Sequence, residues 1–261
     1  MKIDLNGKRA LVCGSTQGIG YASAKTLAEA GASVTLLARN EQKLIQAKGM
    51  LVTAHQSHQY VVADFAKPDE LKEKVDSEIK KNGGFDILIN NTGGPKAGPI
   101  LTALSDEFND AFSNHLLCNH LLVQSCIEHM KANNFGRIIN IISTSVKQPL
   151  RGLGVSNTIR AAVANWAKTL SVELAPFGIT VNNVLPGATA TQRLQEIIKN
   201  KSVKTGIDEE LVSKEMLHEI PAGRFAQPDE IANAVVFLAS LEASYINGIN
   251  LPVDGGRTSC L

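Results

Sequence analysis

The chain has 261 residues, of which 44% are hydrophobic and 20% charged, an ordinary composition for a globular protein. Its net charge of +1 gives no strong attraction to nucleic acid or to an anionic membrane. No apolar stretch approaches the roughly 20 residues of a membrane-spanning helix, and the N-terminus lacks the apolar core of a signal peptide. The four cysteines and six histidines show no metal-ligand spacing, so we expect a soluble, reduced, cytoplasmic protein without a metal site.

Short apolar runs alternate with longer helical stretches along the chain. Strands are expected at Lys8–Gly14, Ser33–Ala38, Tyr60–Ala63, Phe85–Asn90, Arg137–Ser143, Ile179–Leu185 and Ile249–Val253. Helices are expected at Gly18–Ala30, from Glu41, at Asp69–Lys80, twice within Ser105–Lys131, and at Ser156–Ala175 and Pro228–Ser240. The strands are continuous Val, Ile and Leu runs, which is typical of strands buried on both faces of a parallel sheet. This pattern predicts a doubly wound, Rossmann-type α/β fold in a single domain over residues 1–261.

One polar, helix-prone insertion, Ala190–Ile220, interrupts the alternation of strands and helices. It follows the carboxyl end of a strand, which is where ligands bind in such folds. We interpret residues 190–220 as a lid over the substrate. The alternative is a mobile excursion of the surface without a role in binding.

A glycine-rich turn joins the first predicted strand to the first predicted helix. It reads Cys13-Gly14-Ser15-Thr16-Gln17-Gly18-Ile19-Gly20. Glycines let the backbone turn tightly and approach a pyrophosphate, and the helix N-terminus offers unpaired N–H groups at the positive end of its dipole. The place of this turn in a βαβ series predicts a dinucleotide-binding site.

The glycine spacing, Gly-x-x-x-Gly-x-Gly, resembles that of the short-chain dehydrogenase/reductase family. The resemblance continues through Asn90-Asn91-Thr92-Gly93, Asn114, Gly136–Ser143, Pro186-Gly187 and Asp254-Gly255-Gly256, and covers essentially the whole chain. It is strongest to the 3-oxoacyl-carrier-protein reductase branch. It implies that the cofactor is bound by Gly14, Ser15, Thr16, Gly18, Ile19, Gly20, Asp64, Phe65, Asn91, Gly93, Arg160, Pro186, Gly187 and Thr189.

Arg39 lies at the end of the second predicted strand, where NAD- and NADP-binding proteins of this fold differ. At the end of the second strand, an acidic residue would hydrogen-bond the ribose 2′-hydroxyl of NAD, but this chain has Ala38 and then Arg39. An arginine pairs with a 2′-phosphate through charge-assisted bonds, which favours NADP(H) as the cofactor. The alternative is that Arg39 is a solvated residue. Asp64, which resembles the family's adenine contact, would equally serve to cap the following helix.

The catalytic segment departs from the family pattern at two positions. The resemblance implies a Ser that polarises the carbonyl, an Asn that positions a water, a Tyr that transfers the proton, and a Lys that lowers the Tyr pKa and holds the nicotinamide ribose. Ser143 and Asn114 match the first two, whereas Ser156 and Arg160 occupy the Tyr and Lys positions. A serine hydroxyl is a far weaker acid than a phenol, and losing a general acid typically costs about 10²–10⁴ in rate.

The remaining polar groups offer few substitutes for the missing proton donor. The candidates are Lys96, Lys147, His115, a relayed water and the substrate itself. The two lysines are equally interpreted as solvated loop residues, and His115 as a packed helix residue. Arg160 is expected to hydrogen-bond the ribose hydroxyls, and Ser143 and Ser156 to hold a carbonyl oxygen together.

These observations predict an NADP(H)-dependent oxidoreductase that acts on a carbonyl/hydroxyl pair of a small-molecule or acyl-carrier substrate. Two alternatives stay open: a lyase or isomerase step on the same scaffold, and a binding or regulatory subunit that pairs with an active relative. The resemblance further implies a homotetramer that associates through the helices over Ala111–Lys131 and Ser156–Ala175. We expect Val123, Ile127 and Trp166 at that contact.

Overall fold

Seven short strands form the centre of the molecule. In the computed structural model, which describes residues 3–260, they form one parallel sheet of order β3-β2-β1-β4-β5-β6-β7. Their bounds are β1 Arg9–Cys13, β2 Ser33–Ala38, β3 Gln59–Val62, β4 Ile87–Asn90, β5 Gly136–Ile141, β6 Ile179–Pro186 and β7 Asn250–Val253. The strand order reverses between β1 and β4, and such a reversal opens a ligand-binding crevice at the carboxyl ends of the strands.

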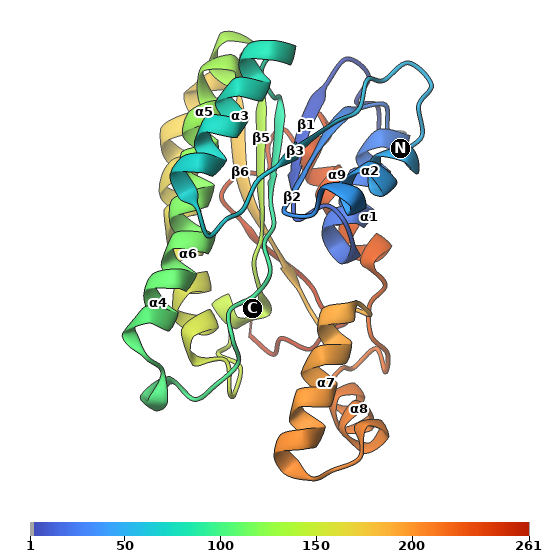
Figure 1. The fold of residues 1–261 in the computed structure, drawn as a ribbon, viewed down its shortest axis with the longest axis vertical. Coiled ribbons are helices and arrows are strands. Elements are labelled where there is room, and N and C mark those ends of the chain that lie inside the picture. Colours follow the sequence, from blue (N-terminus) through green and yellow to red (C-terminus); the bar gives the residue numbers. More distant parts are fainter. Residues whose placement is uncertain (1–2, 261) are drawn as a thin grey trace.

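Helices cover both faces of the sheet, which confirms the predicted doubly wound fold. Helices α3, α5 and α6 lie on one face, and α1, α2 and α9 lie on the other (Figure 1). Buried apolar side chains fill the space between each helical layer and the sheet. The helices span α1 Gly18–Glu29, α2 Glu41–Gly49, α3 Pro68–Asn82, α4 Ser105–Phe112, α5 Cys118–Ala132, α6 Gly154–Leu174, α7 Gln192–Thr205, α8 Glu209–His218 and α9 Pro228–Ala239. Within residues 3–260, no helix is long and apolar enough to span a membrane.

A chain of asparagine side chains joins four neighbouring strands. The amide of Asn90 donates to Asn140 at 2.9 Å, Asn140 donates to Asn183 at 2.9 Å, and Asn183 donates to Asn250 at 2.8 Å. Successive members are also register partners in the sheet. Because buried amides need partners, this chain fixes the relative heights of the strand ends on which the site is built.

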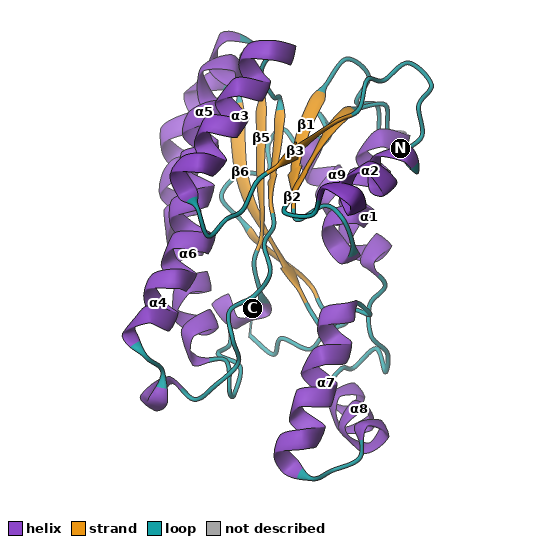
Figure 2. Cartoon of the chain, in the orientation of Figure 1, coloured by secondary structure: helices purple, strands orange, loops and turns teal. Residues whose placement is uncertain are grey.

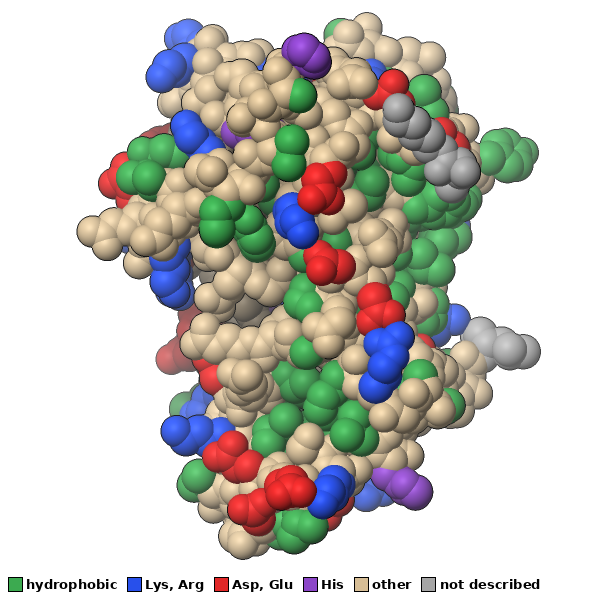
Figure 3. Space-filling model, turned by 90° about the vertical axis from the view of Figure 1, so that its right-hand side faces the viewer, with side chains coloured by type: hydrophobic (Ala, Val, Ile, Leu, Met, Phe, Trp, Pro, Cys, Tyr) green, Lys and Arg blue, Asp and Glu red, His purple; other side chains and the backbone are tan. Residues whose placement is uncertain are grey.

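The predicted insertion after β6 forms helices α7 and α8, which pack together and extend beyond the strand ends (Figure 2). The Thr191 side chain caps α7 by accepting a hydrogen bond from the Leu194 N–H, and Gly206 ends this helix in the left-handed conformation. The outer surface of the pair carries acidic and basic side chains (Figure 3). One pair between the helices joins Lys201 to Glu215 at 2.9 Å. The helix-forming tendency of residues 190–220 is confirmed, and their action as a lid stays a prediction.

Two segments differ from the expected elements. The two helices expected over residues 105–131 form one continuous run, because a π-helical turn at Ser113–Leu117 joins α4 to α5. Strand β5 ends at Ile141 instead of Ser143, since the Ser143 side chain caps the following turn.

The expectation that Val123 contributes to a subunit contact is wrong, because this side chain is only 4% exposed within the single chain. Ile127 and Trp166 are partly buried.

Candidate active site

A cavity of about 870 Å³ lies at the carboxyl ends of the strands. Every predicted catalytic and cofactor residue lines it except Ser15. The Ser15 side chain is fully buried, and its hydroxyl oxygen accepts a hydrogen bond from the Leu37 N–H at 2.9 Å. Ser15 therefore ties the glycine loop to β2, whereas its neighbours face the cavity.

The glycine loop and the end of β4 form a tightly packed cradle. Gly14 has a φ of +58°, and a Cβ atom on Gly20 would meet the Gly14 carbonyl oxygen and lie 2.7 Å from Asn91 Nδ2. The Asn91 amide donates to the carbonyl oxygens of Cys13 and Gly14 at 3.2 and 3.3 Å, and so fixes the loop against β4. A side chain at either glycine would displace this backbone.

The first turn of α1 is left open to an anion. Gln17, the residue that precedes α1, makes no capping hydrogen bond with its side chain, and no acidic residue lies in the first turn. The first N–H groups of a helix lack partners within the helix and carry the positive end of its dipole. Together with the glycine cradle, this arrangement fits the pyrophosphate of a dinucleotide.

Charged residues also line the cavity near the carboxyl ends of β2 and β3. Arg39 and Lys43, which lie after β2, line the wall together with Asp64 and Phe65, which lie after β3. The Asp64 carboxylate accepts a hydrogen bond from the Ala66 N–H at 3.0 Å, so it also caps the turn that leads to α3. Two cations at the end of β2 fit a 2′-phosphate better than an unmodified ribose.

The predicted catalytic residues lie beyond β1 on the opposite part of the cavity. Ser143 follows β5, Ser156 and Arg160 lie one turn apart on α6, and Asn114 belongs to the π-helical turn. The Ser143 oxygen accepts a hydrogen bond from the Ser145 N–H at 3.1 Å, which leaves its hydroxyl proton free to donate. Four polar groups from three segments therefore converge on one space, as the sequence predicts.

Arg160 is a buried cation without an acidic partner. Its side chain is 7% exposed, and Nη1 donates to the Ile141 carbonyl oxygen at 3.1 Å. Its Nε atom has no hydrogen-bond partner, and within residues 3–260 no carboxylate lies within 4.0 Å. Burial lowers the pKa of Arg160 to about 10, which still leaves the guanidinium charged near neutral pH.

A buried histidine close to Arg160 pairs with a partly buried threonine. His115 is 2% exposed, and its Nδ1 atom lies 2.6 Å from Thr92 Oγ1. Burial, with a smaller contribution from the charge of Arg160, lowers the His115 pKa to about 2. His115 is therefore neutral at physiological pH and does not act there as a cationic acid. Thr92 belongs to the motif after β4 and His115 follows Asn114, but the sequence does not indicate that their side chains meet.

None of the three side chains considered as substitute proton donors lines the main cavity. The Lys96 side chain is 83% exposed and lies 3.6 Å from Glu107. Lys147 lies on the short turn after β5, and His115 is packed inside the helical layer. The described site therefore contains the hydroxyls of Ser143 and Ser156 and the Arg160 cation, without a side-chain acid that titrates near neutral pH.

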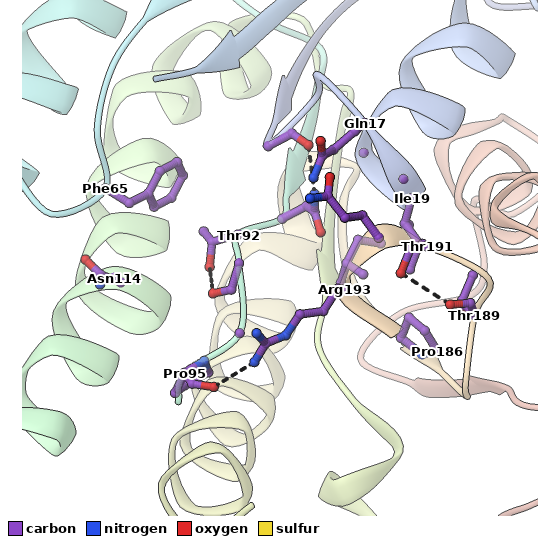
Figure 4. Close-up of a pocket in the computed structure, with 18 of the residues that line it drawn as sticks. Gln17, Ile19, Phe65, Thr92, Pro95, Asn114, Pro186, Thr189, Thr191 and Arg193 are labelled. Carbon is purple, nitrogen blue, oxygen red and sulfur yellow. Dashed lines mark hydrogen bonds between the residues drawn. The ribbon is translucent and has the colours of Figure 1, made fainter. Parts of the chain in front are cut away.

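Sequence reasoning missed Arg193, which reaches across the cavity from α7. Its Nη2 atom donates to the Pro95 carbonyl oxygen at 3.1 Å, and Nη1 lies 3.5 Å from Glu196 (Figure 4). The contact joins positions 98 residues apart, and no local sequence motif predicts it. Thr191, Gln17 and Lys43 also line the cavity without having been predicted.

Comparisons with known proteins identify the family of this chain. The model of a family described as enoyl-(acyl carrier protein) reductase matches residues 14–258. The chain is 30% identical to the NADPH-dependent reductase BacG of Bacillus subtilis (strain 168), over 97% of this chain and 98% of that protein. It is 33% identical to the 3-oxoacyl-[acyl-carrier-protein] reductase FabG of Vibrio harveyi, over 97% and 98% of the two chains. The chain belongs to the short-chain dehydrogenase/reductase family.

Solved structures of short-chain dehydrogenases/reductases have the same fold over their full length. The L-sorbose reductase of Gluconobacter frateurii, complexed with NADPH and L-sorbose, has a TM-score of 0.93 at 32% identity, with 100% of both chains covered. A gluconate 5-dehydrogenase from Burkholderia cenocepacia J2315, in complex with NADP and tartrate, has a TM-score of 0.89 at 30% identity, with 100% of this chain and 98% of that chain covered. The family assignment made from the motifs is thereby confirmed.

Proposed function

We propose that this short-chain dehydrogenase/reductase is an NADPH-dependent reductase of a carbonyl compound. The cofactor is NADP(H), as Arg39 predicts and as the NADPH- and NADP-bound relatives support. The observation that carries the proposal is the convergence of Ser143, Ser156 and Arg160 on the cavity that contains the glycine cradle. The comparisons return reductases and dehydrogenases and do not favour a non-redox or regulatory subunit.

When bound, NADPH supplies a hydride to an electrophilic carbon. The residues of this chain act on the oxygen of the same carbonyl group. Ser143 and Ser156 donate hydrogen bonds to this oxygen as negative charge develops on it, and the Arg160 guanidinium stabilises that charge in a water-poor setting. The proton that completes the alcohol comes from water, because the described lining around Ser143, Ser156 and Arg160 contains no side-chain acid that titrates near neutral pH. The net reaction consumes one carbonyl compound, one NADPH and one proton, and yields an alcohol and NADP⁺.

Reduction of a carbon–carbon double bond conjugated to a carbonyl is a second candidate. Hydride addition to such a double bond places the negative charge on an enolate oxygen, which is much less basic than an alkoxide. Two hydroxyls and a guanidinium hold an enolate without immediate protonation, and protonation at carbon then follows from water. The missing phenol favours this reaction, and so does the description of the matching family model as an enoyl reductase.

The test uses the purified chain, NADPH and a panel of ketones, aldehydes, 3-oxoacyl thioesters and conjugated enones. We expect NADPH oxidation with at least one member, and the product mass and NMR spectrum decide between alcohol and saturated carbonyl. The resemblance in the sequence predicts a 3-oxoacyl-carrier-protein substrate, and the thioesters test that prediction. If NADPH binds but the chain reduces no member of the panel, the proposal is wrong.

A further inference from the structure

The two ends of the cavity differ in charge. The end next to β2 and β3 holds Arg39, Lys43 and Asp64, which suits a phosphorylated adenosine. On the other side of β1, the charged residues of the described lining are Arg160 and Arg193, and no carboxylate lines that part. The part of the cavity that holds Ser143 and Ser156 is therefore positively charged. A neutral substrate does not require this positive charge.

Arg160 is a buried cation that has no negatively charged partner among the described residues. It is more than nine-tenths buried, its Nε atom has no partner, and its one hydrogen bond is to a neutral carbonyl oxygen. A buried charge without a counter-charge is strongly unfavourable, so the bound state has to supply negative charge at this point. The oxygen of the reacting carbonyl group supplies this negative charge only while the reaction proceeds.

Arg193 offers a second, accessible guanidinium on the facing wall. It lies in the first turn of α7 and crosses the cavity toward the loop at Gly94 and Pro95 (Figure 4). Its side chain is 44% exposed, and so is about half of the Glu196 side chain beside it. Exposed pairs of this kind contribute little, so a ligand can replace these contacts at small cost. A guanidinium binds a carboxylate through two parallel hydrogen bonds, which neither the Pro95 carbonyl nor Glu196 provides here.

We propose that the substrate carries a carboxylate, that Arg193 binds this carboxylate at the cavity mouth, and that Arg160 faces the reacting oxygen. This inference rests on the proposed reductase function and narrows its substrate class to oxo acids or unsaturated oxo acids, in preference to neutral ketones and thioesters. Arg193 is then a specificity residue on α7.

The experiment compares each acid with its methyl ester. The probes are 4-formylbenzoate and benzoylformate, each beside its ester, with NADPH and the full chain. The acids should have kcat/KM values about tenfold or more above those of the esters, since charge-assisted hydrogen bonds are about twice as strong as neutral ones. Arg193→Ala should abolish this preference, mainly by raising KM for the acids, so that each acid and its ester have similar kcat/KM values. Lys199→Ala is the matched control, because it removes an exposed cation of the same helix that does not line the cavity.

Two further measurements distinguish failure of the proposed carboxylate site from failure of the reductase proposal. NADPH affinity of Arg193→Ala should equal that of the natural chain, and a loss of affinity with the acid preference intact would mean that Arg193 binds cofactor phosphate, which overturns the proposal. If no probe is reduced, calorimetry of the NADP⁺ complex with benzoate and benzamide decides without turnover. Binding of benzoate alone, lost in Arg193→Ala, supports the carboxylate site even though the reductase proposal has failed. Equal binding of the two compounds overturns the site.

Discussion

Replacing Gly20 by alanine tests whether the glycine loop is a cofactor cradle. The new Cβ would meet the Gly14 carbonyl oxygen and would lie 2.7 Å from Asn91 Nδ2. Both neighbours are fixed, since Asn91 itself is hydrogen-bonded to the loop. The backbone that approaches the pyrophosphate must therefore shift. Overpacking of a close-packed site costs about 1–3 kcal/mol, which corresponds to a roughly 5- to 150-fold change in an equilibrium constant.

We expect Gly20→Ala to weaken NADPH binding by that factor, as measured by fluorescence titration of the purified chain. Gly49→Ala is the matched control, because Gly49 lies in helix α2 with nothing within 4 Å of its added Cβ. That control should leave NADPH affinity unchanged and should not destabilise the chain, because Gly49 is the last residue of α2 and its added Cβ has open space around it. Thermal unfolding of both variants separates loss of binding from loss of folding. A folded Gly20→Ala chain that binds NADPH as tightly as the natural one would refute the assignment of the cradle.

Three other predictions concern particular residues, and a fourth concerns the oligomeric state. Arg39→Asp should reverse or abolish the preference for NADPH over NADH, and equal affinities in the natural chain would contradict the role of Arg39. Asn140→Ala should destabilise the chain by about 1–3 kcal/mol for each buried amide left unpaired, as read from urea unfolding. Because the pKa of His115 in the folded state, about 2, lies below its ordinary 6.5, the unfolded chain takes up a proton first as the pH falls below 6.5. Stability should thus decrease by up to about 1.4 kcal/mol per pH unit, as read from urea unfolding at several pH values. His115→Leu should remove this component, and an unchanged pH dependence in that variant would contradict the depressed pKa of His115. Light scattering at micromolar concentration should give a homo-oligomer, for which a tetramer is expected, and a monomer mass would refute it.

Much of the fold could be predicted because the signals are local. Continuous apolar runs such as Ile179–Leu185 identify buried parallel strands, and glycines between strand and helix mark the crevice. In a doubly wound fold, strand ends meet at one edge, so Ser143 and Pro186 could be expected near Gly14 from topology alone. The cavity lining agrees with that expectation.

The parts that were not predicted depend on contacts between distant positions. The pattern that marks Ser15 as a loop residue does not reveal that its side chain turns inward to Leu37. The π-helical turn around Asn114 joins α4 to α5, and the apolar pattern of residues 105–131 does not distinguish this continuous run from two separate helices. The His115–Thr92 pair and the reach of Arg193 to Pro95 form only when separate segments come together.

The most direct test of the reductase account compares the natural chain with the Ser156→Tyr/Arg160→Lys double variant in the NADPH oxidation assay, with product identification. The account predicts that the natural chain reduces at least one substrate through its hydroxyls and guanidinium. In the double variant, a phenol beside a lysine should raise carbonyl reduction by about 10²–10⁴, the usual contribution of a positioned general acid. Thermal unfolding and NADPH titration first establish that the larger Tyr is accommodated. If both proteins fold and bind NADPH but neither reduces any member of the panel, the reductase account is contradicted.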